Sequence, residues 1–595
     1  MNKRKTQSEK HKTKNNSLKF LILSFGFAFF ILHFTSSSFS QTDDLELIID
    51  VNSPTVPLPL IYKPNIDLSG RGFNRDATWP QTLAAEEAIN AWERDLGLNN
   101  VYRMQYNLWE ISQTRDAETR DKLRANYEAV IKKISDAKGT VILNLFGMPA
   151  GLGKALDKRS AFRDFKIFKA YVKDIIRDLS CYKKYNIWYE VWNAPDLDEF
   201  FLGRQQDYLL MYRAVAEACK ELEKETKINI PVGGPSVSAW FRDTEGNSVL
   251  TPERSLIYSL IRYCYSYHLP LDFISWHGYS SDPDRDSEKT VYKRSMAVLI
   301  RDWLSYFHFD RDTPLIIDEW NFDRDANLLI ERGENSFIAA SFIPSRLEKM
   351  RQAGLDSQVY FSLEDFENKN EGVVRNVGAF YFYPERSGYK GGPKSVINVF
   401  RMIKALGSEM YAARLEDEFC QAISTRTEEG LAVIINNYID PDSARNYLSE
   451  NIAGLNGSQI KSLLDIIKTD KLQKIVQGNY NLAPLRLTSK VKRLLENAQK
   501  INESAKKFLA ESRAVKITIK NLNGDYLYQL YKSDSSCSRD CDFAPVEEKV
   551  IAVSGTIEED LKLAPYSVNM IVLKKQPGKP QAAVMEEVLK KEEGK

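Results

Sequence analysis

The sequence predicts an α/β fold: a (β/α)8 TIM barrel followed by a C-terminal β-sandwich that carries a helical insertion. Between about residues 41 and 406, short apolar segments alternate with longer amphipathic ones, which is the pattern of a parallel sheet or barrel. From about residue 407 to 574, short strand-like segments predominate, as in a small sandwich. A stretch at about 440–513, helical in pattern and rich in Lys, Leu and Asn, interrupts these strands.

Eight segments of the first region have the composition of strands, which is the number that closes such a barrel. We expect these strands at about 65–68, 101–106, 140–146, 187–192, 230–233, 273–277, 315–319 and 358–362. Helices are expected at about 117–138, 162–179, 204–225 and 337–354, because apolar residues recur there three and four positions apart.

The second region predicts five sandwich strands, at about 420–425, 430–438, 514–522, 526–532 and 566–573. The insertion at 440–513 has two interpretations. It is either a solvated helical hairpin that packs on the sandwich or an arm that binds a partner or a glycan. The segment 575–595 is rich in Pro, Glu and Lys, and we expect it to be disordered.

The N-terminus has the three-part layout of a secretory signal. A basic lead precedes an apolar run at 20–34, and Ser38-Phe-Ser40 follows it. We therefore expect residues 1–40 to be a signal peptide and the protein to be exported to the periplasm or the cell exterior. The alternative is an uncleaved segment that anchors the chain to a membrane through residues 20–34.

Composition excludes several classes of partner. The chain has 82 Lys and Arg residues against 81 Asp and Glu, so no field for nucleic acid is implied. The spacing of the six cysteines matches no zinc pattern, and we expect neither a metal nor a cofactor. Cys537 and Cys541 are either a small loop disulfide or two free thiols.

Two strands end in residues that can perform chemistry. The strand at 187–192 stops at Asn193-Ala-Pro195, a turn signal, and the strand at 315–319 brings Asp318 and Glu319 to its carboxyl end. In a barrel of this kind the pocket forms at the carboxyl ends of the strands. Other polar and aromatic residues fall at the same ends: Arg103, Gln105, Trp109, Asp196, His277, Tyr279, Trp320 and Glu364.

These stretches resemble glycoside hydrolase family 39, the relatives of β-xylosidase and α-L-iduronidase within a clan of retaining (β/α)8 glycosidases. The family motif Glu-Val-Trp-Asn-Glu-Pro ends in its acid/base Glu, and a Thr-Glu-Trp-type motif holds its nucleophile. Here the first motif reads Glu190-Val-Trp-Asn-Ala-Pro195 and the second reads Asp318-Glu-Trp320. The resemblance therefore implies that Glu319 is the nucleophile and that Ala194 stands where the acid/base would be.

The resemblance also assigns binding roles. It implies that Asn193 contacts the hydroxyl next to the reacting carbon and that His277 and Tyr279 belong to the substrate site. Gln105 departs from the family, which usually has His at that position. Arg103 is interpreted as a substrate-site residue or an ion-pair partner that keeps Glu319 ionised. Trp320 and Trp109 are interpreted as sugar platforms or as core residues.

A retaining glycosidase needs a carboxylate that attacks the anomeric carbon and a second, protonated carboxyl about 5 Å away. Glu319 can supply the first group, whereas the methyl group of Ala194 cannot supply the second. Asp196 or its loop neighbours could substitute if the loop folds back, and Glu364 is a further candidate. Glu190 points to the same side as Ala194 but lies about 13 Å down its strand, at a rise of roughly 3.3 Å per residue.

Two functions follow from the sequence. The first is an exported retaining O-glycoside hydrolase that acts on a glycan or glycoside, for example a xyloside or uronide. The alternative is a catalytically impaired pseudoenzyme that binds glycans on the same barrel. A third hypothesis, a structural partner in polysaccharide assembly, depends only on the insertion and the possible anchor.

Overall fold

The computed structural model describes residues 45–70, 82–114, 116–239, 251–287, 294–322, 336–368, 373–375, 377–385, 388–451, 455–469 and 471–577. The expected signal peptide at 1–40 and the possible anchor at 20–34 lie outside the described residues. Most of the expected disordered tail, from residue 578 onward, also lies outside them.

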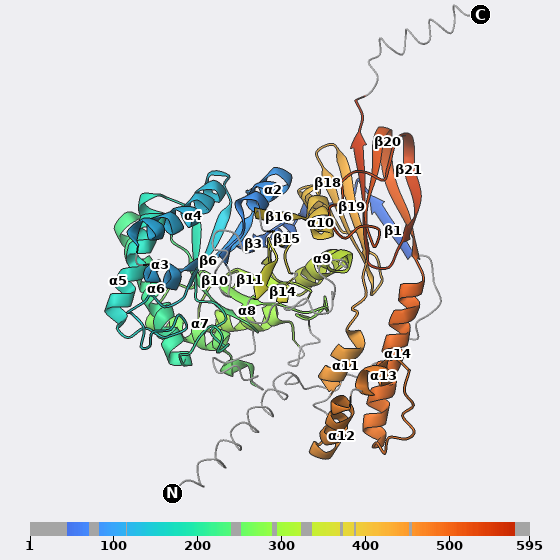
Figure 1. The fold of residues 1–595 in the computed structure, drawn as a ribbon. Coiled ribbons are helices and arrows are strands. Elements are labelled where there is room, and N and C mark those ends of the chain that lie inside the picture. The colour runs from blue at the N-terminus through green and yellow to red at the C-terminus, as the bar shows by residue number, and fades with distance from the viewer. Residues whose placement is uncertain are drawn as a thin grey trace, which may run out of the picture.

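Eight parallel strands form a closed barrel in the order β10-β11-β12-β3-β6-β7-β8-β9, surrounded by helices (Figure 1). The predicted barrel is therefore confirmed. The strands are β3 (Ile66–Asp67), β6 (Val101–Asn107), β7 (Thr140–Phe146), β8 (Ile187–Val191), β9 (Val232–Val237), β10 (Phe273–His277), β11 (Leu315–Trp320) and β12 (Ser357–Tyr360). Their residues are almost all buried, as expected where helices cover the outside of a sheet and side chains fill its interior.

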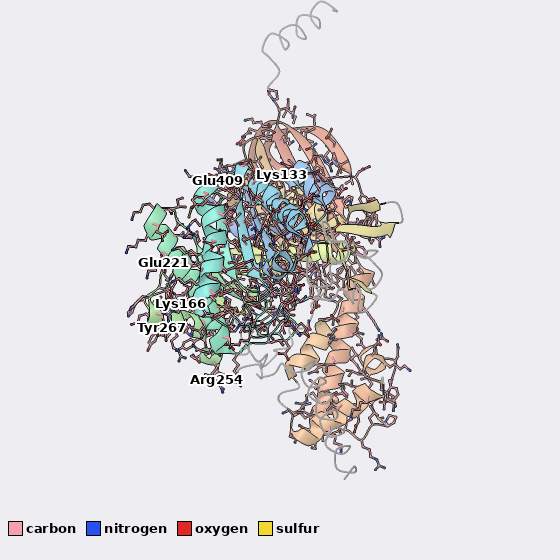
Figure 2. The ribbon with its side chains drawn as sticks, turned by 60° about the vertical axis from the view of Figure 1, so that its left-hand side comes forward. Lys133, Lys166, Glu221, Arg254, Tyr267 and Glu409 are labelled. Carbon is pink, nitrogen blue, oxygen red and sulfur yellow. A yellow bond between two sulfur atoms is a disulfide. The ribbon has the colours of Figure 1, made fainter. Side chains whose placement is uncertain are left out.

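The barrel helices bury one apolar face against the strands and leave charged residues outside. In Figure 2 the labelled side chains of Lys166, Glu221 and Tyr267 lie along the outer side of the barrel. The helices are α2 (Glu86–Leu96), α3 (Leu108–Gln113), α4 (Ala117–Asp136), α5 (Phe165–Ile176), α6 (Gln205–Thr226), α7 (Leu256–Tyr267), α8 (Met296–Tyr306), α9 (Ser336–Gln352) and α10 (Ser395–Lys404). Between β12 and α10, strands β15 (Phe380–Glu385) and β16 (Gly388–Pro393) form a hairpin.

The C-terminal domain is one continuous eight-stranded sheet in the order β1-β20-β22-β19-β18-β17-β2, with β21 paired to β20. Its later strands are β17 (Glu409–Tyr411), β18 (Cys420–Thr427), β19 (Gly430–Asn437), β20 (Arg513–Ser533), β21 (Glu547–Leu563) and β22 (Ser567–Lys575). Residues of β1, β19, β20 and β22 share one buried apolar cluster, so the sheet folds over its own core. The expected sandwich is thus supported only in part.

Strand β20 differs from the prediction of two separate strands at 514–522 and 526–532. It runs through 21 residues, and its pairing register with β21 shifts between Lys520 and Leu522. The N-terminal half pairs with β1 and the C-terminal half pairs with β22, so the irregularity lets one strand serve both parts of the folded sheet. The sequence analysis missed β21, because a sheet-edge strand with alternating exposed residues has no continuous apolar run.

The first described strands also belong to the C-terminal sheet rather than to the barrel. Strand β1 (Leu45–Asp50) pairs with β20, and β2 (Thr55–Pro57) pairs with β17. The expected barrel domain at 41–406 included both strands. The difference has a local cause, because Leu47 and Ile49 alternate with exposed residues and so need one buried face, which the C-terminal core provides.

The expected insertion at 440–513 is helical and has its own small core. It comprises α11 (Ser443–Asn451), α12 (Gly457–Lys468), α13 (Lys471–Val476) and α14 (Ser489–Ala510), which lie below the sheet in Figure 1. Leu463, Ile475, Val491 and Leu495 are buried among these helices. The insertion therefore has more than the two helices of a hairpin.

The barrel and the sheet are joined through side chains of α9 and the 534–543 loop. The Asn436 amide of β19 donates to Ser345 Oγ of α9 at 2.7 Å. A disulfide joins Cys537 and Cys541 in the loop, and Ser395 N donates to Ser538 O at 3.0 Å. Within the described ranges, no helix combines the length and apolarity that a membrane crossing requires.

We predict that Ile49→Ala destabilises the protein by about 2–5 kcal/mol, because it leaves a cavity in the core of the C-terminal sheet. Ile48→Ala is the matched control, since Ile48 is 44% exposed on the other face of the same strand. Its effect should stay within about 0.5 kcal/mol. Urea unfolding followed by circular dichroism measures both. Equal losses in the two variants would contradict the pairing of β1 with β20.

Candidate active site

The guanidinium of Arg103 lies at the centre of a group of carboxylates inside the barrel. The side chain has no exposed surface. Its Nη1 donates to Glu319 Oε1 at 2.7 Å and to Asp67 Oδ2 at 3.0 Å, and its Nε donates to Glu190 Oε2 at 2.7 Å. Asp318 Oδ2 lies 3.8 Å from Nε. One cation therefore faces four carboxyl groups from β3, β8 and β11.

The remaining nitrogen of Arg103 binds the loop that follows β8 and the carboxyl end of β9. Nη2 donates to Asn193 Oδ1 at 2.6 Å and to Ser236 Oγ at 3.1 Å. Ser236 Oγ in turn lies 3.2 Å from His277 Nε2. The planar guanidinium has a fixed fork of donors. It therefore sets the positions of the Asn193 amide, the Ser236 hydroxyl and the three carboxyl groups that accept its hydrogen bonds.

An irregularity in β11 brings two adjacent acids to the same side of the strand. Successive side chains of a regular strand point to opposite faces. The pairing register of β11 shifts on both sides of this position, against β10 after Trp276 and against β12 after Ile317. Asp318 and Glu319 can therefore both face Arg103.

Glu319 is held by three groups and is almost completely buried. Oε1 accepts from Arg103, while Oε2 accepts from the Tyr279 hydroxyl at 2.8 Å and lies 3.4 Å from His277 Nδ1. Burial raises the pKa of Glu319, although Arg103 and the Tyr279 hydrogen bond act in the opposite direction. The structure therefore brings Glu319, Arg103, His277 and Tyr279 together, as the resemblance implies.

The other three carboxyls differ in their tendency to hold a proton. Burial and then the charge of Glu190 hold the pKa of Asp318 well above its usual range. Burial raises the pKa of Asp67 to about 6. Burial also disfavours the charge on Glu190, but Arg103 and further hydrogen bonds outweigh it and lower the pKa of Glu190. Glu190 is therefore the carboxyl that ionises more readily beside Arg103, and Asp318 is the one that holds its proton more readily.

Glu190 is fixed from two further strands. Its Oε1 accepts from Ser275 Oγ at 2.7 Å, and its Oε2 accepts from Asn144 Nδ2 at 2.8 Å. Because both of its oxygens are engaged inside the barrel, Glu190 belongs to the supporting framework. This agrees with its depth on the strand and leaves the position of Ala194 without an acid from the same strand.

The backbone around Ala194 has left-handed conformations at three residues with side chains. The φ angles are 68° at Trp192, 41° at Ala194 and 54° at Ser236. Such a conformation costs an L-residue roughly 1–2 kcal/mol. Ala194 N donates to Ser236 O at 2.9 Å, which joins the two strained segments. Strain of this kind is concentrated at functional sites because the surrounding structure must enforce it.

Ala194 itself is 1% exposed and presents only a methyl group. Asp196, two residues further on, is engaged with the next loop: its Oδ1 accepts from Ser238 N at 2.8 Å, and its Oδ2 accepts from the Ser238 hydroxyl. Both oxygens of Asp196 are therefore engaged in fixing the loop after β9.

Of three other predicted residues, Trp320 and Glu364 are buried with partners outside the carboxylate group. Trp320 is fully buried, donates from Nε1 to Gln358 Oε1 at 2.6 Å and packs edge-on against Tyr360, so it is a core residue with no face for a sugar. Glu364 is buried beside the first barrel loop, where it accepts from Ala85 N at 3.2 Å. Gln105 lies two residues beyond Arg103 on β6, which places it on the same side of that strand.

The sequence analysis gave no role to Asp67, Asp318, Ser236, Ser275 or Asn144. Each lies at or near the carboxyl end of a barrel strand, with its side chain in the carboxylate group or its hydrogen-bond network. A weak signal exists in the sequence, since these are polar residues within apolar strands and buried polar residues require partners. Among the described residues, no three His, Cys, Asp or Glu side chains are arranged to hold a metal ion.

Comparisons with known proteins point to one family. Residues 153–439 match the family model described as glycosyl hydrolases family 39. A β-xylosidase of Caldicellulosiruptor saccharolyticus is 25% identical over 266 residues, covering 43% of this chain and 49% of the relative. A β-xylosidase of Geobacillus stearothermophilus is 24% identical over 268 residues, covering 42% and 47% respectively. The chain thus spans about half the length of the curated relatives it matches.

Solved structures share the fold. A family 39 glycoside hydrolase of Xanthomonas axonopodis pv. citri superposes with a TM-score of 0.59 at 14% identity, covering 91% of this chain and 99% of the other. A monomeric β-xylosidase of Caulobacter crescentus gives 0.59 at 14% identity, covering 89% and 100%. These likenesses support the TIM-barrel fold, and the family match and the curated relatives show that part of this chain is similar to glycosyl hydrolases of family 39.

We predict that Arg103→Met lowers the free energy of unfolding by about 3–5 kcal/mol at pH 8, because it leaves buried carboxylates without their cation. Loss of the cation raises the pKa of each carboxyl, so the folded variant takes up protons as the pH falls. The deficit should therefore shrink at pH 5. Chemical denaturation at both pH values measures it. Arg426→Met, at a partly exposed ion pair, should cost less than about 1 kcal/mol at either pH. A deficit independent of pH would contradict this account.

Proposed function

We propose that this chain is a family 39-type retaining glycoside hydrolase in which Glu319 is the nucleophile and the acid/base position is vacant. The observation that carries the proposal is the carboxylate of Glu319 at the carboxyl end of β11, held by Arg103 and Tyr279. The match to family 39 over residues 153–439 supports the reaction class. The substrate is then a glycan or glycoside, with a xyloside or uronide as the first candidates.

The contacts of Glu319 suit attack on an anomeric carbon. The charge of Arg103 favours the ionised carboxylate, which is the nucleophilic form. Two donors at its oxygens, from Arg103 and Tyr279, fix the direction of the carboxylate before a substrate arrives. Fixed geometry of this kind reduces the reorganisation that the transition state requires.

Asn193 is placed to bind the substrate beside Glu319. Its Oδ1 accepts from the same guanidinium that binds Glu319. Its Nδ2 is buried and finds no hydrogen-bond partner among the described residues. A buried amide donor without a partner is costly unless a ligand satisfies it. We assign this donor to a sugar hydroxyl, as the resemblance to the family implies.

The vacant position determines which substrates can react. The methyl group of Ala194 cannot protonate a leaving oxygen, Asp196 is bound to Ser238, and Glu190 is bound to Arg103. General acid catalysis is worth about 10² to 10⁴ in rate. A sugar leaving group therefore departs slowly, whereas an acidic phenol can depart without a proton donor. We further propose export of the protein, on the basis of the signal-like segment at 1–40.

The vacancy also favours a second candidate, a glycan-binding pseudoenzyme. In that case Arg103, Asn193 and Glu319 form a site that retains a sugar without turnover. Fold cannot separate the two candidates, because function depends on the site and not on the barrel.

The test uses aryl glycosides with good leaving groups, xylosides and uronides included, with and without azide. We predict azide-dependent turnover in the native chain, because azide can attack the glycosyl-enzyme without a general base. Ala194→Glu should increase kcat/KM for substrates with poor leaving groups by about 10² to 10⁴ and kcat/KM for those with good leaving groups far less, because kcat/KM reports the step in which the leaving group departs. Glycosyl azide formation measured by chromatography reports the reaction.

Glu319→Gln is the control, since it keeps the shape of the side chain and removes the nucleophilic charge. It should abolish turnover with and without azide. Absence of turnover in every variant, together with retained binding of xylo-oligosaccharides measured by calorimetry, would select the pseudoenzyme.

A further inference from the structure

The segment 278–287, which follows β10, is attached to the nucleophile strand along one side. Gly278 N donates to Glu319 O at 2.8 Å, and Ser280 N donates to Asn321 O at 3.3 Å. Between them, Tyr279 sends its hydroxyl to Glu319 Oε2 at 2.8 Å. We name residues 278–287 the Tyr279 loop. The position of this loop determines whether the Tyr279 hydroxyl reaches Glu319.

The other side of the Tyr279 loop is attached to the start of the helical insertion. The Tyr438 hydroxyl at the end of β19 donates to Ser281 O at 2.6 Å. Asn446 of α11 directs its amide toward Ser281 Oγ at 3.4 Å and donates to Asp440 Oδ2 at 2.7 Å. The Ser281 hydroxyl also acts to lower the pKa of the nearby Asp440 carboxyl. The insertion and the nucleophile are thus connected through one short loop.

Asp440 is the residue that connects these contacts. It is the first residue of the insertion, and its Oδ1 accepts from Asp442 N at 2.9 Å, which fixes the turn into α11. Its Oδ2 holds the amide of Asn446. The charge of the Asp282 carboxyl, in the loop, raises the pKa of Asp440. A change at Asp440 therefore alters the turn, the helix start and the loop together.

We propose that Asp440 is a positioning residue for the reaction: through Ser281 and Asn446 it holds the Tyr279 loop where Tyr279 supports Glu319. The inference depends on the proposed function, because it concerns the nucleophile assigned there. It also gives the insertion at 440–513 a role, since the base of the insertion is the outer support of an active-site loop.

The attachment of the Tyr279 loop to the insertion depends on pH. Burial and then the charge of Asp282 raise the pKa of Asp440 to about 7. The titratable groups that face Asp440 are Asp282 from the loop, Asp442 from its own segment, Tyr438 from β19 and Tyr566 from the turn before β22. Arg445 lies 3.8 Å from Asp442. Below pH 7 Asp440 is neutral beside Asp282, and above it the two carboxylates repel each other.

The sign of the stability effect follows from the raised pKa. The folded state holds a proton on Asp440 that the unfolded chain has already released, so stability falls as the pH rises toward 7 and stays low above it. Asp440→Asn keeps an acceptor for the Asp442 N–H group and cannot ionise. The native chain should therefore lose melting temperature relative to Asp440→Asn between pH 5 and pH 8.

A double-mutant cycle tests positioning through Tyr279. Tyr279→Phe removes a hydrogen bond to a charged group and should lower kcat on an aryl xyloside by roughly 10- to 100-fold. Asp440→Ala should lower kcat by about twofold or more. Because both substitutions act on the hydrogen bond between Tyr279 and Glu319, the double variant should be no slower than Tyr279→Phe alone. Multiplied effects in the double variant would overturn the inference and leave the proposed function standing.

Asp465→Ala is the matched control, since Asp465 lies exposed on α12 of the same insertion. It should change neither kcat nor the melting temperature. Absence of turnover in the native chain, in the presence of azide, would remove the proposed function and the catalytic part of this inference together. In that case the melting temperatures still test whether Asp440 attaches the Tyr279 loop to the insertion. If the melting temperatures of the native chain and of Asp440→Asn change equally with pH, this attachment is overturned.

Discussion

The site depends on one buried cation. Arg103 has no exposed surface, and its three nitrogens bind groups from β3, β8, β9 and β11 and from the loop after β8. Several carboxyls can remain buried together only because this cation is present and because some of them keep their protons. The arrangement fixes the Glu319 carboxyl, the Asn193 amide and the Ser236 hydroxyl on a common support. The methyl group of Ala194 takes no part in this hydrogen-bond network.

The sequence was sufficient to predict the barrel but not the full sheet beside it. Buried parallel strands are near-continuous apolar runs, so the eight barrel strands were recognisable without their partners. Strands β1 and β21 depend on distant partners, and their alternating patterns do not indicate which core they join. The insertion was recognisable as helical from its periodicity, whereas its attachment to the Tyr279 loop required the structure.

The residues of the candidate site also fall into those that the sequence could predict and those that required the structure. Glu319, Arg103, His277 and Tyr279 could be proposed from strand ends and from resemblance, and the structure brings them together. Trp320 could not be assigned, because adjacent residues of a regular strand alternate faces and the irregularity in β11 changes that alternation. Asp318 was visible beside Glu319, but the upward shift of its pKa depends in part on Glu190, which lies on another strand. Such an effect depends on side chains from different strands that meet in the fold, so no single segment of the sequence reveals it.

The pairing of β1 with β20 joins the two ends of the described chain. Asp50 and Asn521, which are bonded at this junction, are 471 residues apart in the sequence. During synthesis, residues 45–50 leave the ribosome long before their partner exists, and the whole barrel is made in between. The barrel must therefore fold with the first strand of the other domain still unpaired, and an unpaired apolar strand invites association with other chains. The C-terminal sheet can close only after β20 has been made, so β1 finds its partner only after the whole barrel has been synthesised.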